Sequence, residues 1–345
     1  MRWRGKSVQE YGGYTPPVPA MFRYLVTRLA FSVLLVAVVS SAALLLTRMA
    51  PGDITSEQVG TGVSGRAIEA ERARLGLDRP VGEQYARWVG RAVRLDFGTS
   101  LMYGRPVAGL VAERARNTAV LAVVALLLAT LIGLPLGVVS GSRTGVVAAA
   151  IRAASVLALS LPSLVSSLLL VFVAARTGWL PTGGMTSIDP NGAGGWMAAA
   201  ADLARHLILP VCAIALPLAA TIERIQSEAT ASTLREPFVA AALARGVPPG
   251  RMLWRNTLKP ALRPVTSIFG LVFGGLLSGS FVVEIVTSWP GLGRLMFDAL
   301  RSRDLYLVAG CAAAGGVFLA LGALVSDLAL AAIDPRLRGR EGAGS

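Results

Sequence analysis

Few residues of this chain have the types and spacing that enzyme chemistry requires. His206 is the sole histidine, and with a serine such as Ser160 or Ser163 it could supply the base and nucleophile of an intramembrane hydrolase. No serine stands in a G-x-S-x-G nucleophile elbow, and His206 lies at the end of an apolar block, where a histidine is more often interfacial. The sequence therefore predicts no catalytic residue and keeps a hydrolase only as an alternative.

Nucleotide and metal sites are not indicated either. Gly5-Lys6-Ser7 is the only Gly-Lys-Ser, and it begins too early to have the first glycine of a P-loop. Cys212 and Cys311 both lie in apolar blocks, where they form neither a disulfide framework nor a metal-binding spacing. We expect no metal and no cofactor in this chain.

The composition is that of a membrane protein. Of 345 residues, 54% are hydrophobic and 15% are charged, whereas soluble domains have about 25% charged residues. The mean hydropathy is +0.61, which excludes a disordered chain. The net charge of +13 comes almost wholly from arginine. In so apolar a chain this charge favours loops that face anionic lipid over a nucleic-acid partner.

Apolar blocks of membrane-spanning length must position any functional residue. A helix needs about 20 apolar residues to cross a bilayer. Six blocks reach or approach this length: Leu25–Leu46, Ala119–Ser140, Ala153–Ala175, Leu207–Ile222, Val265–Val283 and Leu305–Ile333. The third should be kinked around Pro162, and the fourth is short. The sequence thus predicts an all-α integral membrane protein with six transmembrane helices.

Arginines in the short loops predict the orientation of these helices. They concentrate before the first block, between the second and third, between the fourth and fifth, and after the sixth, so both termini should be cytoplasmic. The first block is too long for a secretory signal and should be a retained anchor. The expected regions are a flexible basic tail (1–20), a first helix (21–47), an extracytoplasmic loop region (48–118), a core with five helices (119–335) and a cytoplasmic tail (336–345).

The cytoplasmic loop 230–263 has the most distinctive pattern. Residues 230–245 read as one helix with a face of alanines, and Gly246 then permits a left-handed stop before Pro248 and Pro249. Gly250 opens a second amphipathic helix. The pattern predicts a compact helical knob, and small residues on its face would let another surface approach closely. The alternative is a basic hairpin that lies on anionic lipid.

At this loop the sequence resembles the inner-membrane permease subunits of binding-protein-dependent ABC importers, in particular the oligopeptide/dipeptide/nickel branch. Ala241, Ala242 and Gly246 match the two alanines and the glycine of the "EAA" coupling loop, while Ala240 replaces its glutamate. Other segments resemble the same branch, and the likeness runs from about Met21 to Arg338: they are Arg48–Asp53, Leu75–Pro80, Asp96–Ser100, Trp289–Arg294 and Asp334–Arg336.

The resemblance implies a type I ABC importer permease fold and a partner set. The coupling loop would sit in a groove of a cytoplasmic ATPase, through Phe238, Ala241, Ala242, Arg245 and Gly246. Two ATPase subunits or domains would bind ATP and Mg, a homologous second permease would complete the pathway, and an extracytoplasmic solute-binding protein would deliver the solute. The membrane would be the bacterial inner membrane. A di- or oligopeptide is the expected solute, with nickel or another small solute as the alternative; a passive channel is a further alternative.

Two acids in the apolar blocks are candidates for the pathway or a gate. Glu284 ends the fifth block, where it could guard the external mouth above a turn and helix formed by Pro290, Gly291 and Gly293. Asp327 lies near the cytoplasmic end of the sixth block, and the resemblance implies a structural role there, with a transport role as the alternative. Small residues at four-residue spacing should let helices pack closely within the chain: Gly270/Gly274, Gly275/Gly279 and Ala312/Gly316.

Overall fold

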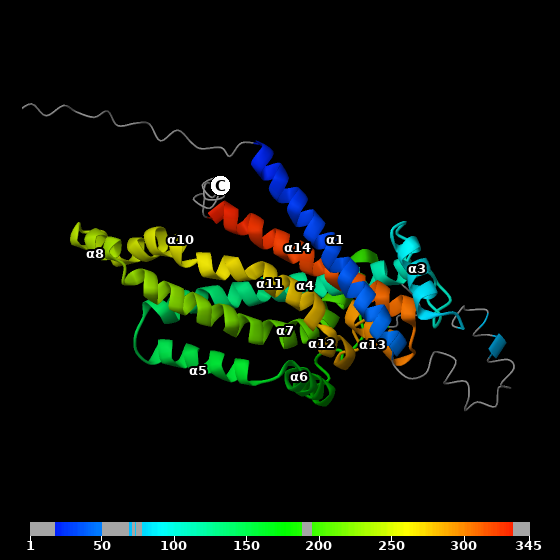
Figure 1. Cartoon of the computed structure of the whole chain (residues 1–345). Coiled ribbons are helices and arrows are strands. Elements are labelled where there is room, and N and C mark those ends of the chain that lie inside the picture. Colours follow the sequence, from blue (N-terminus) through cyan, green and yellow to red (C-terminus); the bar gives the residue numbers. More distant parts are fainter. Residues whose placement is uncertain (1–17, 50–68, 71–72, 74–77, 188–194, 334–345) are drawn as a thin grey trace, which may run out of the picture.

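The computed structural model describes residues 18–49, 69–70, 73, 78–187 and 195–333 (Figure 1). These parts are built from helices, with one isolated β-bridge between Thr99 and Pro106. In chain order the helices are α1 (Val18–Met49), α3 (Val81–Ala92), α4 (Val107–Ser142), α5 (Val146–Ser160), α6 (Ser163–Thr177), α7 (Gly195–Leu234), α8 (Pro237–Ala244), α9 (Pro249–Arg251), the π-helical η2 (Met252–Thr257), α10 (Leu258–Ala261), α11 (Arg263–Gly279), α12 (Phe281–Val286), α13 (Leu292–Arg301) and α14 (Leu305–Ile333).

Four of the described helices are long and apolar enough to cross a membrane. They include residues Val26–Thr47 of α1, all of α4 and α7, and residues Leu305–Leu328 of α14. The pair α5–α6 adds a fifth if it is one broken span, since its halves meet at a bend of 97°. Leu161 is extended and Pro162 precedes α6, so the kink expected at this proline is present and sharp. α11 has 17 residues, somewhat fewer than the about 20 that cross a bilayer.

The centre of the molecule is a close pair of parallel helices, α4 and α7. Three glycines of α4 at four-residue spacing lie against α7: a Cβ on Gly133 would be 2.4 Å from the carbonyl oxygen of Ala219, and one on Gly141 would be 2.2 Å from that of Ser227. Between them, a Cβ on Gly137 would be 2.6 Å from the Cβ of Gln226. The two backbones can approach so closely only because these positions lack side chains.

A second layer joins α11, α14 and α1. A Cβ on Gly270 of α11 would be 2.1 Å from the carbonyl oxygen of Gly322 of α14, and Gly316 of α14 packs against Val36 of α1. The expected close packing within the chain is therefore present at Gly270 and Gly316. α14 runs antiparallel to both neighbours, so the start of α1 and the end of α14 lie at the same end of the bundle, where α11 also begins (Figure 1).

α7 is longer than the sequence pattern indicated. The expected fourth block was Leu207–Ile222, but the helix has 40 residues, from Gly195 to Leu234, despite Pro210 and Pro217. Its second half carries polar residues that lower the hydropathy, yet Glu223 and Gln226 are buried against the glycines of α4. The expectation of one helix over residues 230–245 was wrong, because the chain turns after Leu234 and begins a new helix, α8, at Pro237.

Residues 48–118, which the sequence predicts to be an extracytoplasmic loop region, are described only in part. α3 is an amphipathic helix that buries Trp88 against Leu44 of α1 and Ala309 of α14. Residues 50–68, 71–72 and 74–77, the tail before residue 18 and the segment after residue 333 lie outside the described residues.

Candidate functional site

The loop between α7 and α11 forms a small helical knob at one end of the bundle, here called the knob end (Figure 1). α8 follows α7 after two residues, and Gly246 ends it with a φ of +83°, the left-handed geometry expected of this glycine. The chain then returns through α9, η2 and α10 directly into α11. The knob is thus joined to α7 through two residues and to α11 through one residue, Leu262.

The knob has an interior and an exposed face. Val239 and Ala242 are buried against Met252 of η2, with Leu234 and Val247 packed around them. The remaining candidate coupling residues are exposed: Phe238, Ala241, Arg245 and Gly246. Ala242 therefore supports the knob from inside, while the other four are available to a partner. These assignments to coupling remain predictions.

At the opposite end of the bundle, here called the α13 end, Glu284 is fully buried in a cluster of hydrogen bonds. Its Oε1 accepts hydrogen bonds from the hydroxyls of Thr118 on α4 at 2.7 Å and Ser280 at 2.8 Å. Its Oε2 accepts one from the backbone N–H of Arg294 at 3.1 Å. A Cβ on Gly291 would be 2.3 Å from the carboxyl carbon, so only glycine leaves room for it. The structure therefore brings Glu284 together with the turn that the sequence placed beside it.

α4 holds the same turn from the other side. The side-chain amide of Asn117 donates a hydrogen bond to the backbone carbonyl of Pro290 at 2.8 Å. The backbone carbonyl of Asn117 accepts one from the indole N–H of Trp289 at 3.2 Å. Thr118 accepts a hydrogen bond from the N–H of Leu292 at 2.7 Å. We name Asn117, Thr118, Glu284, Trp289 and Leu292 the outer polar cluster. Because Glu284 is buried, its hydrogen bonds connect α4 with the turn between α12 and α13. A role of Glu284 in the pathway or a gate remains a prediction.

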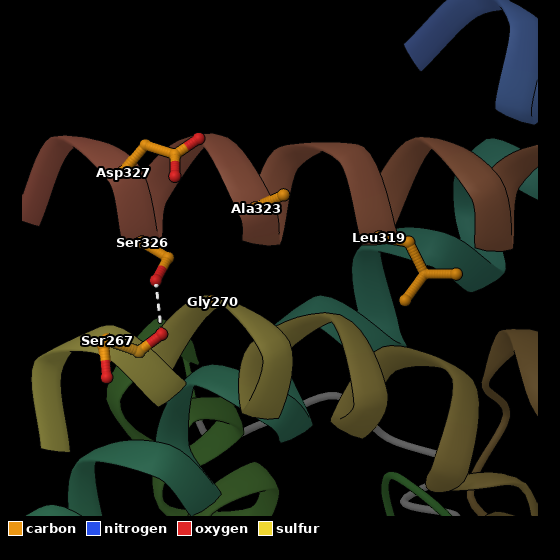
Figure 2. Close-up of a pocket in the computed structure, with 6 residues that line it drawn as sticks. All are labelled: Ser267, Gly270, Leu319, Ala323, Ser326 and Asp327. Carbon is orange, nitrogen blue, oxygen red and sulfur yellow. Dashed lines mark hydrogen bonds between the residues drawn. The ribbon is translucent and has the colours of Figure 1, made fainter. Parts of the chain in front are cut away.

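Asp327 lies near the knob end, away from this cluster. Its carboxylate is 2.5 Å from the guanidinium of Arg28 on α1. Asp327 is also among the residues that line a cavity of about 220 Å³ between α11 and α14. In this cavity Ser326 donates a hydrogen bond to the carbonyl of Ser267 at 3.0 Å (Figure 2). Gly270, Leu319 and Ala323 complete the lining. These contacts join α14 to both neighbouring helices. A structural role for Asp327 and the alternative role in transport both remain predictions.

Two other buried acids were not singled out by the sequence. Asp304 is fully buried at the start of α14, where it accepts hydrogen bonds from the hydroxyl of Ser100 at 2.6 Å and the N–H of Leu307 at 3.1 Å. Glu223 of α7 accepts one from Ser140 of α4. The sequence signal for the second was present, since Gly137 and Gly141 flank Ser140 at the spacing typical of close helix packing.

The remaining candidates for chemistry make local contacts, and the hydroxyl of Ser160 donates a hydrogen bond to the carbonyl of Val156 on its own helix. His206 is buried, and its Nδ1 lies 2.9 Å from the backbone carbonyl of Asp202. Within the described residues no group of three or more His, Cys, Asp or Glu side chains could hold a metal ion.

Comparison with known proteins gives two family matches that together span most of the chain. Residues 133–339 match the model of the binding-protein-dependent transport system inner membrane component. Residues 21–122 match the N-terminal part of such membrane components.

Named relatives are similar over nearly their whole length. The chain is 33% identical to the probable peptide ABC transporter permease protein y4tP of Sinorhizobium fredii, over 91% of this chain and 99% of the relative. It is 31% identical to the oligopeptide transport system permease protein AppB of Bacillus subtilis, over 92% and 99%. It is 32% identical to the glutathione transport system permease protein GsiC of Escherichia coli, also over 92% and 99%.

Among solved structures, the inward-facing MetNI methionine ABC transporter aligns with 65% of this chain and 96% of its own, at a TM-score of 0.48 and 18% identity. The family matches and the full-length relatives leave one conclusion: the chain belongs to the family of binding-protein-dependent transport system inner membrane components.

Proposed function

We propose that this chain is one permease subunit of an ATP-driven importer of di- and oligopeptides and forms half of the translocation pathway. The observation that carries the proposal is full-length similarity to permeases named for peptides, oligopeptides and glutathione. The same names favour a peptide over the nickel alternative. A homologous second permease would supply the other half, and an extracytoplasmic binding protein would capture the solute.

The proposed topology has six crossings with both termini in the cytoplasm. The start of α1 and the end of α14 lie at one end of the bundle, where Arg28 meets Asp327, and this supports an even number of crossings. This supports counting both α5–α6 and α11–α12 as crossings, in addition to the four long helices. The arginine-rich loops then place the knob end in the cytoplasm.

The proposed mechanism is alternating access driven from outside the chain. Two ATPase subunits would bind ATP and Mg and seat the exposed face of α8 in a groove. Closure of the ATPase pair would push α8, and α7 and α11 would carry the displacement toward the α13 end. The chain itself would act as a transport subunit and would not hydrolyse ATP.

The replacement Gly246→Asp tests the coupling role. A side chain at a φ of +83° is strained and projects from the exposed end of α8. We expect the assembled importer to insert normally and hydrolyse ATP, with uptake of peptide largely lost. Uptake per ATP would be measured in proteoliposomes that contain both permeases, the ATPases and the binding protein.

Gly145→Asp is the matched control. Gly145 also has a positive φ, +100°, and no neighbour within 4 Å, so a side chain there is likewise strained but lies in the α4–α5 loop, outside the knob. This variant should couple normally. Normal uptake by Gly246→Asp, or equal loss in both variants, would contradict the assignment of the knob.

The solute class is tested on the cognate binding protein. Calorimetric titration with di- and oligopeptides should show binding, and nickel alone should show none. Binding of nickel without peptide binding would overturn the peptide proposal.

A further inference from the structure

Ser140 is a point at which three helices meet. Its hydroxyl donates a hydrogen bond to the carboxylate of Glu223 on α7, and it lies 3.3 Å from the carbonyl of Gly137 on its own helix. Its backbone carbonyl accepts a hydrogen bond from the guanidinium of Arg152 on α5 at 3.0 Å. Ser140 is 1% exposed and Glu223 is 2% exposed, so water does not compete for the bond between them.

Glycines fix the helices on both sides of this point. Gly137 and Gly141 of α4 lie three residues before and one residue after Ser140, and both positions contact the backbone or Cβ atoms of α7. Because a Cβ at Gly141 would be 2.2 Å from the carbonyl oxygen of Ser227, the helices touch backbone to backbone. Packing at this distance leaves little freedom for α7 to slide or rotate on α4.

The same part of α7 leads directly to the knob. Ser227 lies level with the end of α4, so the seven residues from there to Leu234 extend about 10 Å beyond it at 1.5 Å per residue. Two residues later α8 begins, and its Val239 packs on Leu234. A displacement of α8 is therefore passed to the end of α7 at Leu234, and the continuous helix extends from there back to Glu223.

Burial of the Glu223 carboxylate at this position carries an unfavourable desolvation free energy. Leucine would pack against α4 without a desolvation penalty, whereas a carboxyl group at 2% exposure requires hydrogen bonds. Buried polar contacts are weak evidence for added stability, and their best-attested use is to fix the register of packed helices. The position of Glu223 between the knob and the membrane-embedded bundle suits that use.

We infer that Ser140, Glu223 and Arg152 are positioning residues that join α4, α5 and α7 into one block, so that a push on the coupling helix moves all three together. This inference rests on the proposed importer function. Without the contact, α7 would yield to the push while α4 and α5 stayed behind, and ATP would be hydrolysed without transport.

The experiment compares two replacements of Glu223 in the reconstituted importer. Glu223→Gln keeps an oxygen that accepts the Ser140 hydrogen bond, and it should keep the wild-type ratio of ATP hydrolysed to peptide imported. Glu223→Leu has similar size but no acceptor, and it should raise that ratio about fivefold or more, the lower range of coupling free energies between sites. Loss of stability alone would lower the yield of the complex without changing this ratio.

Glu228→Leu is the control on the same helix, since Glu228 is exposed and lies one turn further along α7. It should keep the wild-type ratio. If Glu223→Leu also keeps that ratio, or if Glu223→Gln loses coupling as completely as Glu223→Leu, the inference is overturned. If the wild-type complex itself imports no peptide, the proposed function fails instead.

Ser140→Ala provides a second variant in case Glu223→Leu does not assemble. It removes only the hydroxyl and should also raise the ratio. Ser142→Ala is its control, because the Ser142 hydroxyl bonds only the carbonyl of Val139 on its own helix. A wild-type ratio in Ser140→Ala would contradict the inference.

Discussion

At the scale of single residues, the outer polar cluster is held by one hydroxyl that serves two partners. Thr118 donates to Glu284 and accepts from the N–H of Leu292, so it joins α4 to both sides of the turn. Glu284 and Leu292 are both buried. Without the hydroxyl the N–H of Leu292 would lose its partner, and the carboxylate of Glu284 would keep only the hydrogen bonds from Ser280 and Arg294.

The replacement Thr118→Val tests this contact, because valine keeps the shape and removes the hydroxyl. We expect a loss of about 1–3 kcal/mol in the free energy of unfolding, since a buried carboxylate and a buried N–H lose a partner. Thermal unfolding of the purified chain in detergent would measure it.

Thr130→Val is the control for this measurement. Thr130 lies on the same helix, but its hydroxyl bonds only the carbonyl of Leu126 one turn earlier. Its replacement should cost much less, and equal losses for the two variants would argue against a special role for Thr118.

The sequence identified the residues that the turn contributes to this cluster, but not those that α4 contributes. Glu284, Gly291 and Gly293 are neighbours in the chain, so the turn itself imposes their proximity. Thr118 is 166 residues away from Glu284 in the sequence. The apolar sequence around Thr118 gives no indication that a carboxylate contacts it in the fold. The sequence therefore predicted that Glu284 lies beside the turn, but not which α4 side chains form hydrogen bonds with this region.

At the scale of elements, the pair of α4 and α7 depends on glycine. The block boundaries from hydropathy were nearly right for α14 and for the apolar part of α1, whose surroundings match their composition. They were wrong for α7, because hydropathy scores each residue alone. Glu223 and Gln226 read as the end of a span, although the glycines of α4 bury them.

The replacement Gly137→Ala tests the helix pair. A Cβ there would be 2.6 Å from that of Gln226, and we expect the overpacking to cost about 1–3 kcal/mol in the free energy of unfolding. Gly109→Ala on the same helix meets nothing within 4 Å and should be neutral or stabilise by up to about 1 kcal/mol. Thermal unfolding of both variants decides the matter, and a neutral Gly137→Ala would show that the helices separate easily.

At the scale of the whole molecule, the helix directions and the arginine distribution lead to the same topology. Arginine in the loops predicted both termini on one side, and the antiparallel packing of α1 on α14 supports an even number of crossings. The direction across the membrane comes from charge alone, because helix packing has no inside or outside.

Labelling of single cysteines tests this topology, in a chain whose Cys212 and Cys311 are changed to alanine. Arg245→Cys on the knob should react with a membrane-impermeant maleimide only after the cells are permeabilised. Val93→Cys, at 79% exposure beyond α3, should react in intact spheroplasts. The reverse pattern would invert the proposed orientation.

The enclosure of Glu223 and Glu284 has a consequence for cargo. Each carboxylate is buried and accepts hydrogen bonds from hydroxyl groups of its own chain, so neither is open to direct contact with a passing solute. A translocation pathway in which these two acids are buried does not select peptides through direct ionic contacts at Glu223 or Glu284. Once delivered to the importer, acidic and basic peptides of equal length should then pass through the half of the pathway formed by this chain at similar rates.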